Sequence, residues 1–515
     1  MSFQYTFDVK VPTRDGIKLS TIIAKPAKPD NGVVYDTIVI RTPYSAKGMF
    51  GLIPSVAPQL PKPMVLLLQD TRGRYDSEGD FDLFNEANDT IDTLNWVVEQ
   101  SWSNGLVHFF GPSYLGYTAL QVLQKESKAT IKSVFSPMTF TSAVDEAIYS
   151  KSGVMNLHHG FPFSIMTSTR VQANLGSING TWPEVYRTAF PAGPKAVGWP
   201  NKIWDTFRNK EELRKWTIHF NPDPDFGIKA TFIASYNDFL CTAGITAFEK
   251  ISAIGGVQPS LKIGPWGHNG YLTSLDHVGT FSISDAGKGN LIADLTRHFE
   301  TVQRPEEQDV SVFILRKDEW RFFDAWPLPT DARQLHLHAD GSLAKLPATT
   351  SELTTIEADI NNPVETLGGP VWEGPTKNLQ PGPIDQRPVN QREDIRKFAS
   401  NPLDQNVTIM GSLSVSIRAG ASLANSHLTA KLYVITNEGE ELIIQEGVAL
   451  LATEELQSYT VDMGFTAIEI KTGERLMLEL SWSNFPRFEL ANHLQNHTIS
   501  FQIDSHSALN YGIIE

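Results

Sequence analysis

The 515-residue sequence contains a single cysteine, Cys241. One thiol cannot form an internal disulfide or a cysteine-based zinc site, and its isolation agrees with a reducing compartment. The sequence also lacks an apolar run of about 18 residues that would span a bilayer. Its first residues lack a basic region followed by an apolar stretch. These absences predict a cytoplasmic protein with no membrane partner.

Clustered positive charge is missing as well. The formal net charge is −15, and lysine and arginine are not gathered into blocks. This balance repels phosphate backbones, so nucleic acid is not expected as a partner. No cofactor or metal is expected either. The adjacent pair His158-His159 lacks metal-ligand spacing, and the acidic segment 221–227 lacks calcium-loop spacing and fits a linker better.

The rest of the composition is that of an ordinary globular protein, with 41% apolar and 20% charged residues. Up to about residue 138, short apolar runs such as residues 37–40 alternate with amphipathic helical patterns, and the alternation resumes at residues 228–235. Such alternation predicts a mostly parallel sheet with helices on both faces. We therefore assign residues 1–138 and 227–308 to one α/β domain.

Residues 139–226 break this rhythm and predict an inserted helical cap. The insert is rich in aromatic residues and poor in strand-like runs. Four of its apolar residues are candidates for a substrate pocket: Phe161, Phe163, Met166 and Trp182. The alternative is that they form the small core of the cap itself, which is the more common role of such residues. His158-His159 is expected on the cap surface or at a pocket rim.

After about residue 308 the pattern changes to apolar residues at every second position, as at Leu413, Val415 and Ile417 and at Leu476, Leu478, Leu480 and Trp482. Several such strands, separated by turn residues, predict an antiparallel sandwich with one buried face. A jelly roll is the form we expect for residues 309–515.

The most informative segment is residues 106–116. Largely apolar residues run into Gly111-Pro-Ser-Tyr-Leu-Gly116, where a helical pattern begins at once. This predicts a sharp strand-to-helix turn that exposes the Ser113 hydroxyl beside the amide donors of a helix N-terminus. The usual elbow is G-x-S-x-G, whereas here Leu115 takes the last glycine position and Gly116 follows it. Because Gly-x-Ser turns also arise by chance, the elbow alone does not decide for catalysis.

Two further residues complete a possible catalytic triad. A serine hydroxyl becomes a nucleophile when a histidine takes its proton and a carboxylate stabilises the imidazolium. Asp238 and His268 each follow an apolar strand, where α/β sheets present functional side chains. Either residue alone has a structural explanation, as a capping aspartate or a packed loop histidine. The order Ser113, Asp238, His268 is that of α/β-hydrolases and favours catalysis.

The oxyanion of such a reaction needs two hydrogen-bond donors. The backbone N–H of Tyr114, directly after Ser113, is the first. The segment Arg41-Thr-Pro-Tyr44 follows an earlier strand, where the second donor is expected. The Tyr44 hydroxyl either donates there or belongs to a tyrosine that caps a sheet edge, and the sequence pattern leaves both open.

Five motifs follow one another along the chain: Arg41-Thr-Pro-Tyr44, Gln69-Asp-Thr-Arg-Gly-Arg-Tyr-Asp-Ser-Glu-Gly79, Gly111-Pro-Ser-Tyr-Leu-Gly116, Tyr236-Asn-Asp238 and Gly264-Pro-Trp-Gly-His268. Together they resemble the cocaine esterase and X-Pro dipeptidyl-peptidase family of serine hydrolases. The resemblance implies an α/β-hydrolase domain, an inserted helical cap and a C-terminal jelly roll. It also implies Ser113 as nucleophile, Asp238 and His268 as its partners, and an oxyanion hole made by the Tyr44 hydroxyl and the Tyr114 amide.

The chain departs from one branch of this family, the α-amino ester hydrolases. In that branch, carboxylates that hold a substrate ammonium directly follow the catalytic aspartate, whereas here Phe239 begins an apolar stretch. An apolar wall does not compensate for desolvating a cation. Phe239 is therefore expected to line the substrate pocket and to disfavour a free α-amino group, unless Asp145 or Glu146 of the cap supplies the charge.

These observations predict acyl transfer to water. Ser113 attacks a carboxylic ester, His268 acts first as general base and then as general acid, and Asp238 orients it. The expected partner is a small-molecule ester or amide, and the sequence leaves open whether the chain forms a homo-oligomer. Three alternatives also remain: a peptidase or amidase resembling X-Pro dipeptidyl-peptidases or β-lactam acylases, an acyltransferase to another nucleophile, and a non-catalytic binding module.

Overall fold

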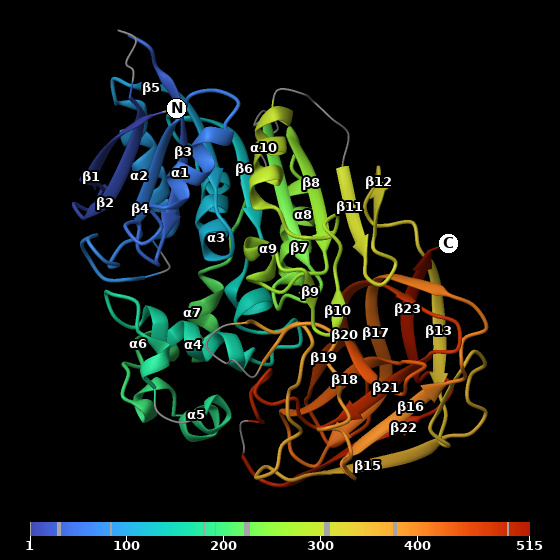
Figure 1. Ribbon diagram of the computed structural model, residues 1–515. Coiled ribbons are helices and arrows are strands. Elements are labelled where there is room, and N and C mark those ends of the chain that lie inside the picture. Colours follow the sequence, from blue (N-terminus) through green and yellow to red (C-terminus); the bar gives the residue numbers. More distant parts are fainter. Residues whose placement is uncertain are drawn as a thin grey trace.

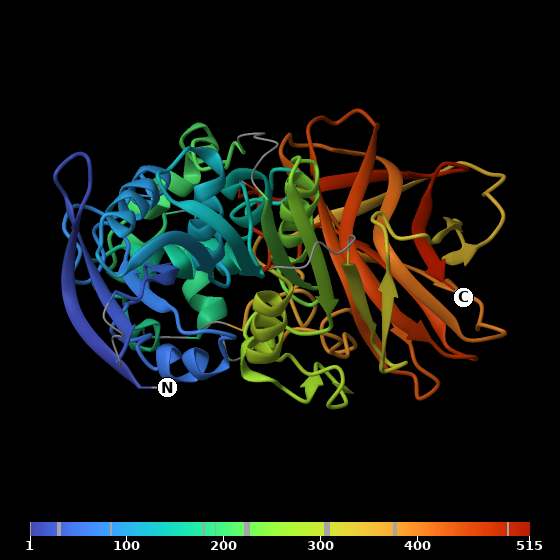
Figure 2. The same cartoon turned by 90° about the horizontal axis from the view of Figure 1, so that it is seen from above.

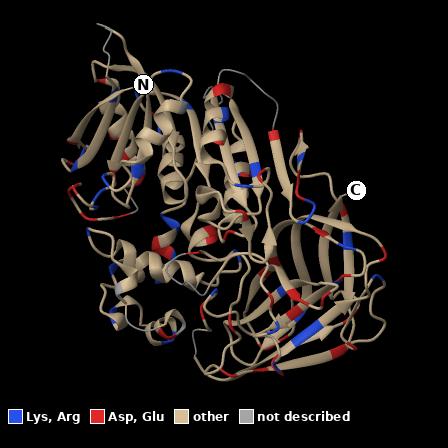
Figure 3. Ribbon diagram, viewed as in Figure 1, with Lys and Arg blue, Asp and Glu red and all other residues tan. Residues whose placement is uncertain are grey.

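The computed structural model describes residues 2–27, 32–82, 85–178, 181–190, 192–220, 227–302, 309–373, 379–491 and 494–514. An α/β unit carries the N-terminus and an all-β unit carries the C-terminus (Figure 1). Seen from above, the two units lie side by side (Figure 2). Lys and Arg are dispersed among Asp and Glu over both (Figure 3).

The α/β unit is built on one mixed sheet. Within the described residues it has ten strands in the order β1-β2-β4-β3-β5-β6-β7-β8-β11-β12. Their bounds are β1 (Phe3–Pro12), β2 (Lys18–Pro26), β3 (Tyr35–Thr42), β4 (Val65–Asp70), β5 (Ser103–Phe110), β6 (Thr130–Pro137), β7 (Ile228–Ser235), β8 (Val257–Gly264), β11 (Asp309–Ile314) and β12 (Glu319–Phe323). The strands from β4 to β11 pair in parallel. This confirms the predicted α/β fold.

Helices cover the two faces of this sheet, so its central strands are largely buried, and β4 is buried along its whole length. The helices are α1 (Leu52–Val56), α2 (Glu86–Val98), α3 (Tyr114–Leu120), α8 (Cys241–Ser252), α9 (Gly270–Thr273) and α10 (Leu291–Thr301), with the short turns η1 (Ala57–Gln59) and η2 (Gln121–Gln124) and the small strands β9 (His277–Val278) and β10 (Phe281–Ser282). In α2, Ile91, Leu94 and Val97 recur at helical spacing and are buried against the sheet.

The insert between β6 and β7 is helical in its described residues. It contains η3 (Ala143–Ala147), α4 (Leu157–Thr167), η4 (Leu175–Ser177), α5 (Trp182–Ala189), η5 (Pro194–Val197), α6 (Lys202–Arg208) and α7 (Lys210–Arg214). Phe161 of α4 is fully buried, and its ring lies 5.6 Å from those of Tyr186 and Trp204. Phe161 therefore belongs to the core of the cap, not to a substrate pocket. The predicted linker, residues 221–226, lies outside the described residues.

The C-terminal unit is all-β, as predicted. In the described residues its strands are β13 (Asp331–Leu337), β14 (Ser342–Ala344), β15 (Glu352–Ala358), β16 (Ile395–Ser400), β17 (Val407–Ala421), β18 (Ser426–Ile435), β19 (Glu441–Leu451), β20 (Gln457–Ile470), β21 (Arg475–Ser481), β22 (His497–Ile503) and β23 (Ala508–Ile514). Their pairings are antiparallel except that of β14 with β16. The jelly-roll form of this unit remains a prediction.

The two sheets divide later than the sequence pattern suggested. The hairpin β11–β12 belongs to the first sheet, because β11 pairs in parallel with β8, so the division follows Phe323 and not residue 308. In the turn between β11 and β12, Leu315 exchanges two backbone hydrogen bonds of 2.9 and 3.0 Å with Ala467 and Glu469 of β20. This contact joins the two units. No helix among the described residues has the length and apolar character needed to cross a membrane.

Candidate active site

Ser113 lies at a strained turn between β5 and α3. Its backbone has φ 56° and ψ −126°, a region that a residue with a side chain rarely occupies. Two hydrogen bonds hold the turn. The Ser113 N–H donates to the Pro137 carbonyl at 2.9 Å, and the Ser113 carbonyl accepts from the Tyr117 N–H at 3.1 Å. These bonds hold the strained turn and with it the serine side chain at the carboxyl edge of the sheet.

The spacing of the two glycines around Ser113 has a steric cause. A Cβ on Gly111 would lie 2.4 Å from the Leu115 Cβ, and one on Gly116 would lie 2.4 Å from the Ser136 Oγ and 2.8 Å from the Gly111 carbonyl oxygen. Both positions therefore require glycine. Leu115, which stands where the usual elbow has glycine, is accommodated because Gly111 opposite has no side chain.

The substitution Gly116→Ala is expected to lower the free energy of unfolding by about 1–3 kcal/mol, the usual effect of forcing a methyl group into a filled space. Urea denaturation of the purified variant measures this loss. Gly51→Ala is the matched control, because a Cβ on Gly51 meets no atom within 4 Å. Equal stability of the two variants would contradict the steric explanation.

The structure brings Ser113, His268 and Asp238 into contact in series. The His268 Nε2 lies 3.1 Å from the Ser113 Oγ, and the His268 Nδ1 lies 3.0 Å from each carboxylate oxygen of Asp238. Asp238 follows β7, and His268 follows β8. The Leu240 N–H also donates to Asp238 Oδ1 at 3.1 Å. Asp238 is almost completely buried, so its charge acts on the imidazole with little screening by water.

Opposing effects set the proton affinity of His268. Burial lowers its pKa, whereas the negative charges of Asp238 and Glu373 and the hydrogen bond to Asp238 raise it; the net effect is a pKa above the usual value for histidine. An imidazole with a raised pKa is a stronger base for the serine proton.

Tyr44 packs against Tyr114, the residue that follows Ser113, with ring centroids 6.5 Å apart. The Tyr114 hydroxyl donates to Glu86 Oε1 at 2.9 Å, and Glu86 pairs with Arg41 at 2.7 Å, so the Tyr114 ring is anchored away from Ser113. In the part of the chain described, the Tyr114 N–H has no acceptor. Burial raises the pKa of the Tyr44 hydroxyl, which therefore keeps its proton.

A wall of rings beside His268 includes the pair His158-His159, which the sequence placed either on the cap surface or at a pocket rim. His158 and His159 are buried and do not lie on the cap surface, because they face the all-β unit: the His158 Nε2 accepts the Trp372 N–H at 2.9 Å. The His159 ring lies 4.2 Å from that of Phe239, which lies 5.1 Å from that of His268. Burial lowers the pKa of His159 to about 3, so this wall is uncharged.

Of the other three predicted pocket residues, Phe163 lies near the triad, whereas Met166 and Trp182 pack within the cap or at its contact with the α/β domain. The Phe163 ring lies 5.9 Å from that of Tyr114 and 5.7 Å from that of His159. Met166 is buried at the end of α4, where its carbonyl accepts a hydrogen bond from Arg74. Trp182 packs on Tyr186, 5.5 Å between rings, with the core of the cap.

The carboxylates proposed for the cap are already engaged. Glu146 accepts hydrogen bonds from the Thr141 N–H at 2.6 Å and the Lys250 ammonium at 2.8 Å, and the hydroxyl of Ser142 lies 3.2 Å from Asp145. Sequence reasoning missed a closer carboxylate, Glu373. It comes from the all-β unit and accepts from the N–H groups of Asn269 and Gly270 at 3.0 and 3.3 Å, next to His268.

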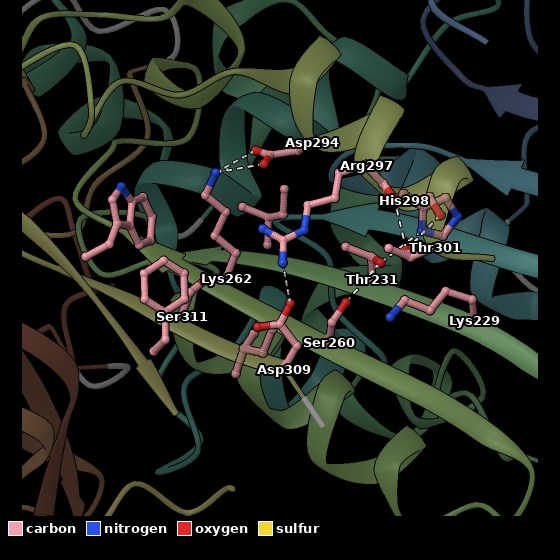
Figure 4. Close-up of a pocket in the computed structure, with 14 residues that line it drawn as sticks. Lys229, Thr231, Ser260, Lys262, Asp294, Arg297, His298, Thr301, Asp309 and Ser311 are labelled. Carbon is pink, nitrogen blue, oxygen red and sulfur yellow. Dashed lines mark hydrogen bonds and ion pairs between the residues drawn. The ribbon is translucent and has the colours of Figure 1, made fainter. Parts of the chain in front are cut away.

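A cavity lies under α10, against β7, β8 and the β11–β12 hairpin (Figure 4), and Ser113, Asp238 and His268 are not among its lining residues. Two ion pairs cross it, Lys262 with Asp294 at 2.7 Å and Arg297 with Asp309 at 3.0 Å. Because these charges compensate one another, the triad is the stronger candidate for chemistry. No group of three or more His, Cys, Asp or Glu side chains in the described ranges could hold a metal ion.

Comparisons with known proteins cover nearly the whole chain. Residues 15–270 match the model of the X-Pro dipeptidyl-peptidase (S15) family, and residues 300–509 match that of the X-Pro dipeptidyl-peptidase C-terminal non-catalytic domain. The cocaine esterase of Rhodococcus sp. (strain MB1 Bresler) is 24% identical over 95% of this chain and 92% of its own.

Two solved structures share the fold over the full length. An aminopeptidase from a marine sediment archaeon, Thaumarchaeota archaeon, has a TM-score of 0.80 at 17% identity and covers 100% of this chain and 97% of its own. An α-amino acid ester hydrolase has a TM-score of 0.79 at 19% identity and covers 99% of this chain and 97% of its own.

Fold and site together define the class of the protein: it is a serine hydrolase with an α/β-hydrolase domain and a C-terminal all-β domain. Within that class, the matches to both domain models identify the family. The chain belongs to the X-Pro dipeptidyl-peptidase (S15) and cocaine esterase family.

Proposed function

We propose that the protein hydrolyses carboxylic esters through an acyl-enzyme formed on Ser113. The observation that carries this proposal is the series of contacts from Ser113 Oγ through His268 to Asp238, at 3.1 and 3.0 Å. These distances lie within the range over which a proton is transferred. The strained turn at Ser113 supports the same assignment.

In the acylation step, Ser113 Oγ attacks the ester carbonyl carbon and its proton passes to His268 Nε2. Asp238 accepts the Nδ1 hydrogen and stabilises the imidazolium. The Tyr44 hydroxyl and the Tyr114 N–H donate to the carbonyl oxygen as it becomes an oxyanion. When the tetrahedral intermediate collapses, the bond to the leaving oxygen breaks and His268 gives its proton to the departing alcohol.

In the deacylation step, water takes the place of the alcohol. His268 removes a proton from the water, whose oxygen attacks the acyl carbon, and a second oxyanion forms at the same donors. Collapse of this intermediate breaks the bond to Ser113 Oγ, which recovers its proton from His268. The products are a carboxylic acid and the free enzyme.

A neutral acyl group suits the surroundings of the triad best. Phe239 and the uncharged ring of His159 border His268, and Glu146 is paired with Lys250. The second candidate function is peptide or amide hydrolysis, which the names of the family and of the archaeal aminopeptidase suggest. Glu373 favours it, because this carboxylate beside His268 accepts only backbone N–H groups and forms no ion pair within the described residues, so its charge remains for a substrate ammonium.

Matched substrates separate the two functions. We expect a fluorophosphonate to label the protein once, at Ser113, and 4-nitrophenyl esters to be cleaved faster than 4-nitroanilides of the same acyl groups. Faster cleavage of aminoacyl or X-Pro anilides would replace the ester proposal by the peptidase one. Products captured by an added amine or alcohol would indicate an acyltransferase. Absence of labelling at Ser113 would favour a binding module.

Replacing Tyr44 by phenylalanine removes one proposed oxyanion donor and leaves the ring. We expect kcat on a 4-nitrophenyl ester to fall about 10²–10³-fold, because the lost hydrogen bond acts in the transition state, while KM changes little. Tyr5→Phe is the control, since Tyr5 is exposed on the edge strand β1. A Tyr44→Phe variant as active as Tyr5→Phe would leave Tyr44 with the role of a sheet-edge tyrosine.

The pH dependence follows from the charges around His268. The base must be unprotonated, so kcat/KM is expected to fall as the pH drops through a pKa above the ordinary histidine value of about 6.5. Glu373→Gln removes one of the charges that raise the pKa of His268. The acid limb of this variant's pH profile, where kcat/KM falls with falling pH, should therefore move to lower pH. Glu357→Gln, far away on β15, should leave the acid limb in place. Identical acid limbs in both variants would contradict the role given to Glu373.

A further inference from the structure

Arg74 is a buried cation that links the α/β domain to the cap. It lies in the loop after β4, and its side chain is fully buried. Its Nε donates to the Pro43 carbonyl at 2.8 Å. Its other nitrogens donate to the carbonyl of Met166 in the last turn of α4, at 3.1 Å, and to that of Thr169, just after α4 ends. The C-terminal end of a helix carries partial negative charge, which suits a guanidinium.

Arg74 forms no ion pair with any carboxylate of the described residues. Its neighbours Arg41 and Arg72 are different, because each is paired at short distance, with Glu86 at 2.7 Å and Asp89 at 2.6 Å respectively. The faces of Tyr75 and Phe81 cover the Arg74 guanidinium, with both ring centroids 5.5 Å away. A charge buried without a counter-ion is costly, and its field extends to the neighbouring groups.

The segment that carries Tyr44 and the ring of Tyr114 both lie near this charge. Pro43, whose carbonyl Arg74 holds, directly precedes Tyr44. Phe81, which covers the guanidinium, packs on Tyr114 with 6.2 Å between ring centroids. The positive charge of Arg74 also opposes the effect of burial on the pKa of Tyr44 and so makes that hydroxyl a stronger donor than burial alone would allow.

We propose that Arg74 is a positioning residue of the oxyanion hole: it fixes the Pro43-Tyr44 segment against the end of cap helix α4 and directs an unneutralised positive charge toward the oxyanion through the Tyr44 hydroxyl. This inference rests on the proposed function, in which Tyr44 is an oxyanion donor. Through Arg74, the position of cap helix α4 on the α/β domain then affects the rate of the chemical step.

A double-mutant cycle tests the inference. In the wild-type background, Arg74→Met is expected to lower kcat on a 4-nitrophenyl ester about tenfold or more with KM nearly unchanged, because the loss is confined to the transition state. Arg74→Lys keeps the charge without the three fixed bonds and should recover part of the loss. In the Tyr44→Phe background, Arg74→Met should lower kcat less than about twofold, because the group through which it acts is absent.

Arg170→Met is the matched control. Arg170 also joins the cap to the α/β domain through three carbonyls, those of Tyr75, Ser77 and Gly79, but it does not contact Pro43. Its replacement should change kcat less than about twofold in either background. Thermal unfolding of all variants shows which of them remain folded. If Arg74→Met does not fold, the comparison of Arg74→Lys with wild type in both backgrounds provides the test.

Two results would overturn the inference: an equal loss of kcat for the Arg74 variants with and without the Tyr44 hydroxyl, or an effect of Arg74→Met no larger than that of Arg170→Met. Failure of the proposed function itself is separately visible. In that case Ser113→Ala would keep its turnover, whereas failure of this inference alone leaves the dependence on Ser113 intact.

Discussion

Replacing Ser113 by alanine is expected to abolish ester hydrolysis, with kcat lowered about 10⁵–10⁶-fold. Without the Oγ no acyl-enzyme forms, and His268 and the oxyanion donors are left with no attacking group. The fold should be retained, because alanine meets the same strain at φ 56° as serine does. Turnover of a 4-nitrophenyl ester and the circular dichroism of the variant measure the two parts of this expectation.

Ser55→Ala is the control for the Ser113 variant. Ser55 lies on the short helix α1, where its hydroxyl donates to the Gly51 carbonyl at 3.0 Å and contacts none of the triad. This variant should keep wild-type turnover and react with a fluorophosphonate, whereas Ser113→Ala should do neither. Wild-type turnover by Ser113→Ala would remove the foundation of the proposed mechanism.

The meeting of Ser113, Asp238 and His268 could be predicted because each of them follows a parallel strand of the α/β sheet. Parallel strands present their carboxyl ends at one edge, so residues far apart in sequence but placed directly after β5, β7 and β8 meet there. The local signals are strong as well: an apolar run ending in Gly111-Pro-Ser113 leaves few alternatives to a sharp turn. The order of the three residues then restricts the arrangement to that of a hydrolase.

The surroundings of the triad could not be predicted in the same way. Glu373 and Trp372 come from the all-β unit, about a hundred residues beyond His268, and no local pattern places a loop of one unit over the active site of another. The burial of His158-His159 follows from the same contact. Phe161 and Phe163 are two residues apart on α4 and face different surroundings, which depends on how the helix is rotated against its neighbours.

The sequence pattern placed the boundary between the two sheets before β11, whereas it lies after β12, and the reason is simpler. In β11, Val310 and Val312 are buried while Asp309 and Ser311 are only partly buried, so apolar and polar residues alternate as in a sandwich strand. The outer strands of an α/β sheet show the same alternation, since only one of their faces is fully covered. Sequence periodicity therefore identified the strand but not the sheet to which it belongs.

Replacing Asp238 by asparagine is expected to lower kcat about 10³–10⁴-fold while leaving the fold intact. The Asp238 carboxylate lies 3.0 Å from the His268 Nδ1 and accepts its hydrogen, which leaves Nε2 free to take the serine proton. The amide N–H of asparagine favours the opposite tautomer, with the hydrogen on Nε2, and the imidazolium loses the charge that stabilises it.

Asp294→Asn is the matched control for Asp238→Asn, because Asp294 also faces a cation, Lys262, but lies in the cavity under α10. We expect the control to keep kcat within about twofold, as substitutions away from the site usually do. Fluorophosphonate labelling adds a second measurement: Asp238→Asn should react far more slowly than wild type, since attack by Ser113 on phosphorus needs the same base. Equal kinetics for the two variants would show that Asp238 is structural and that His268 is oriented by another group, with Glu373 the other described carboxylate whose charge acts on it.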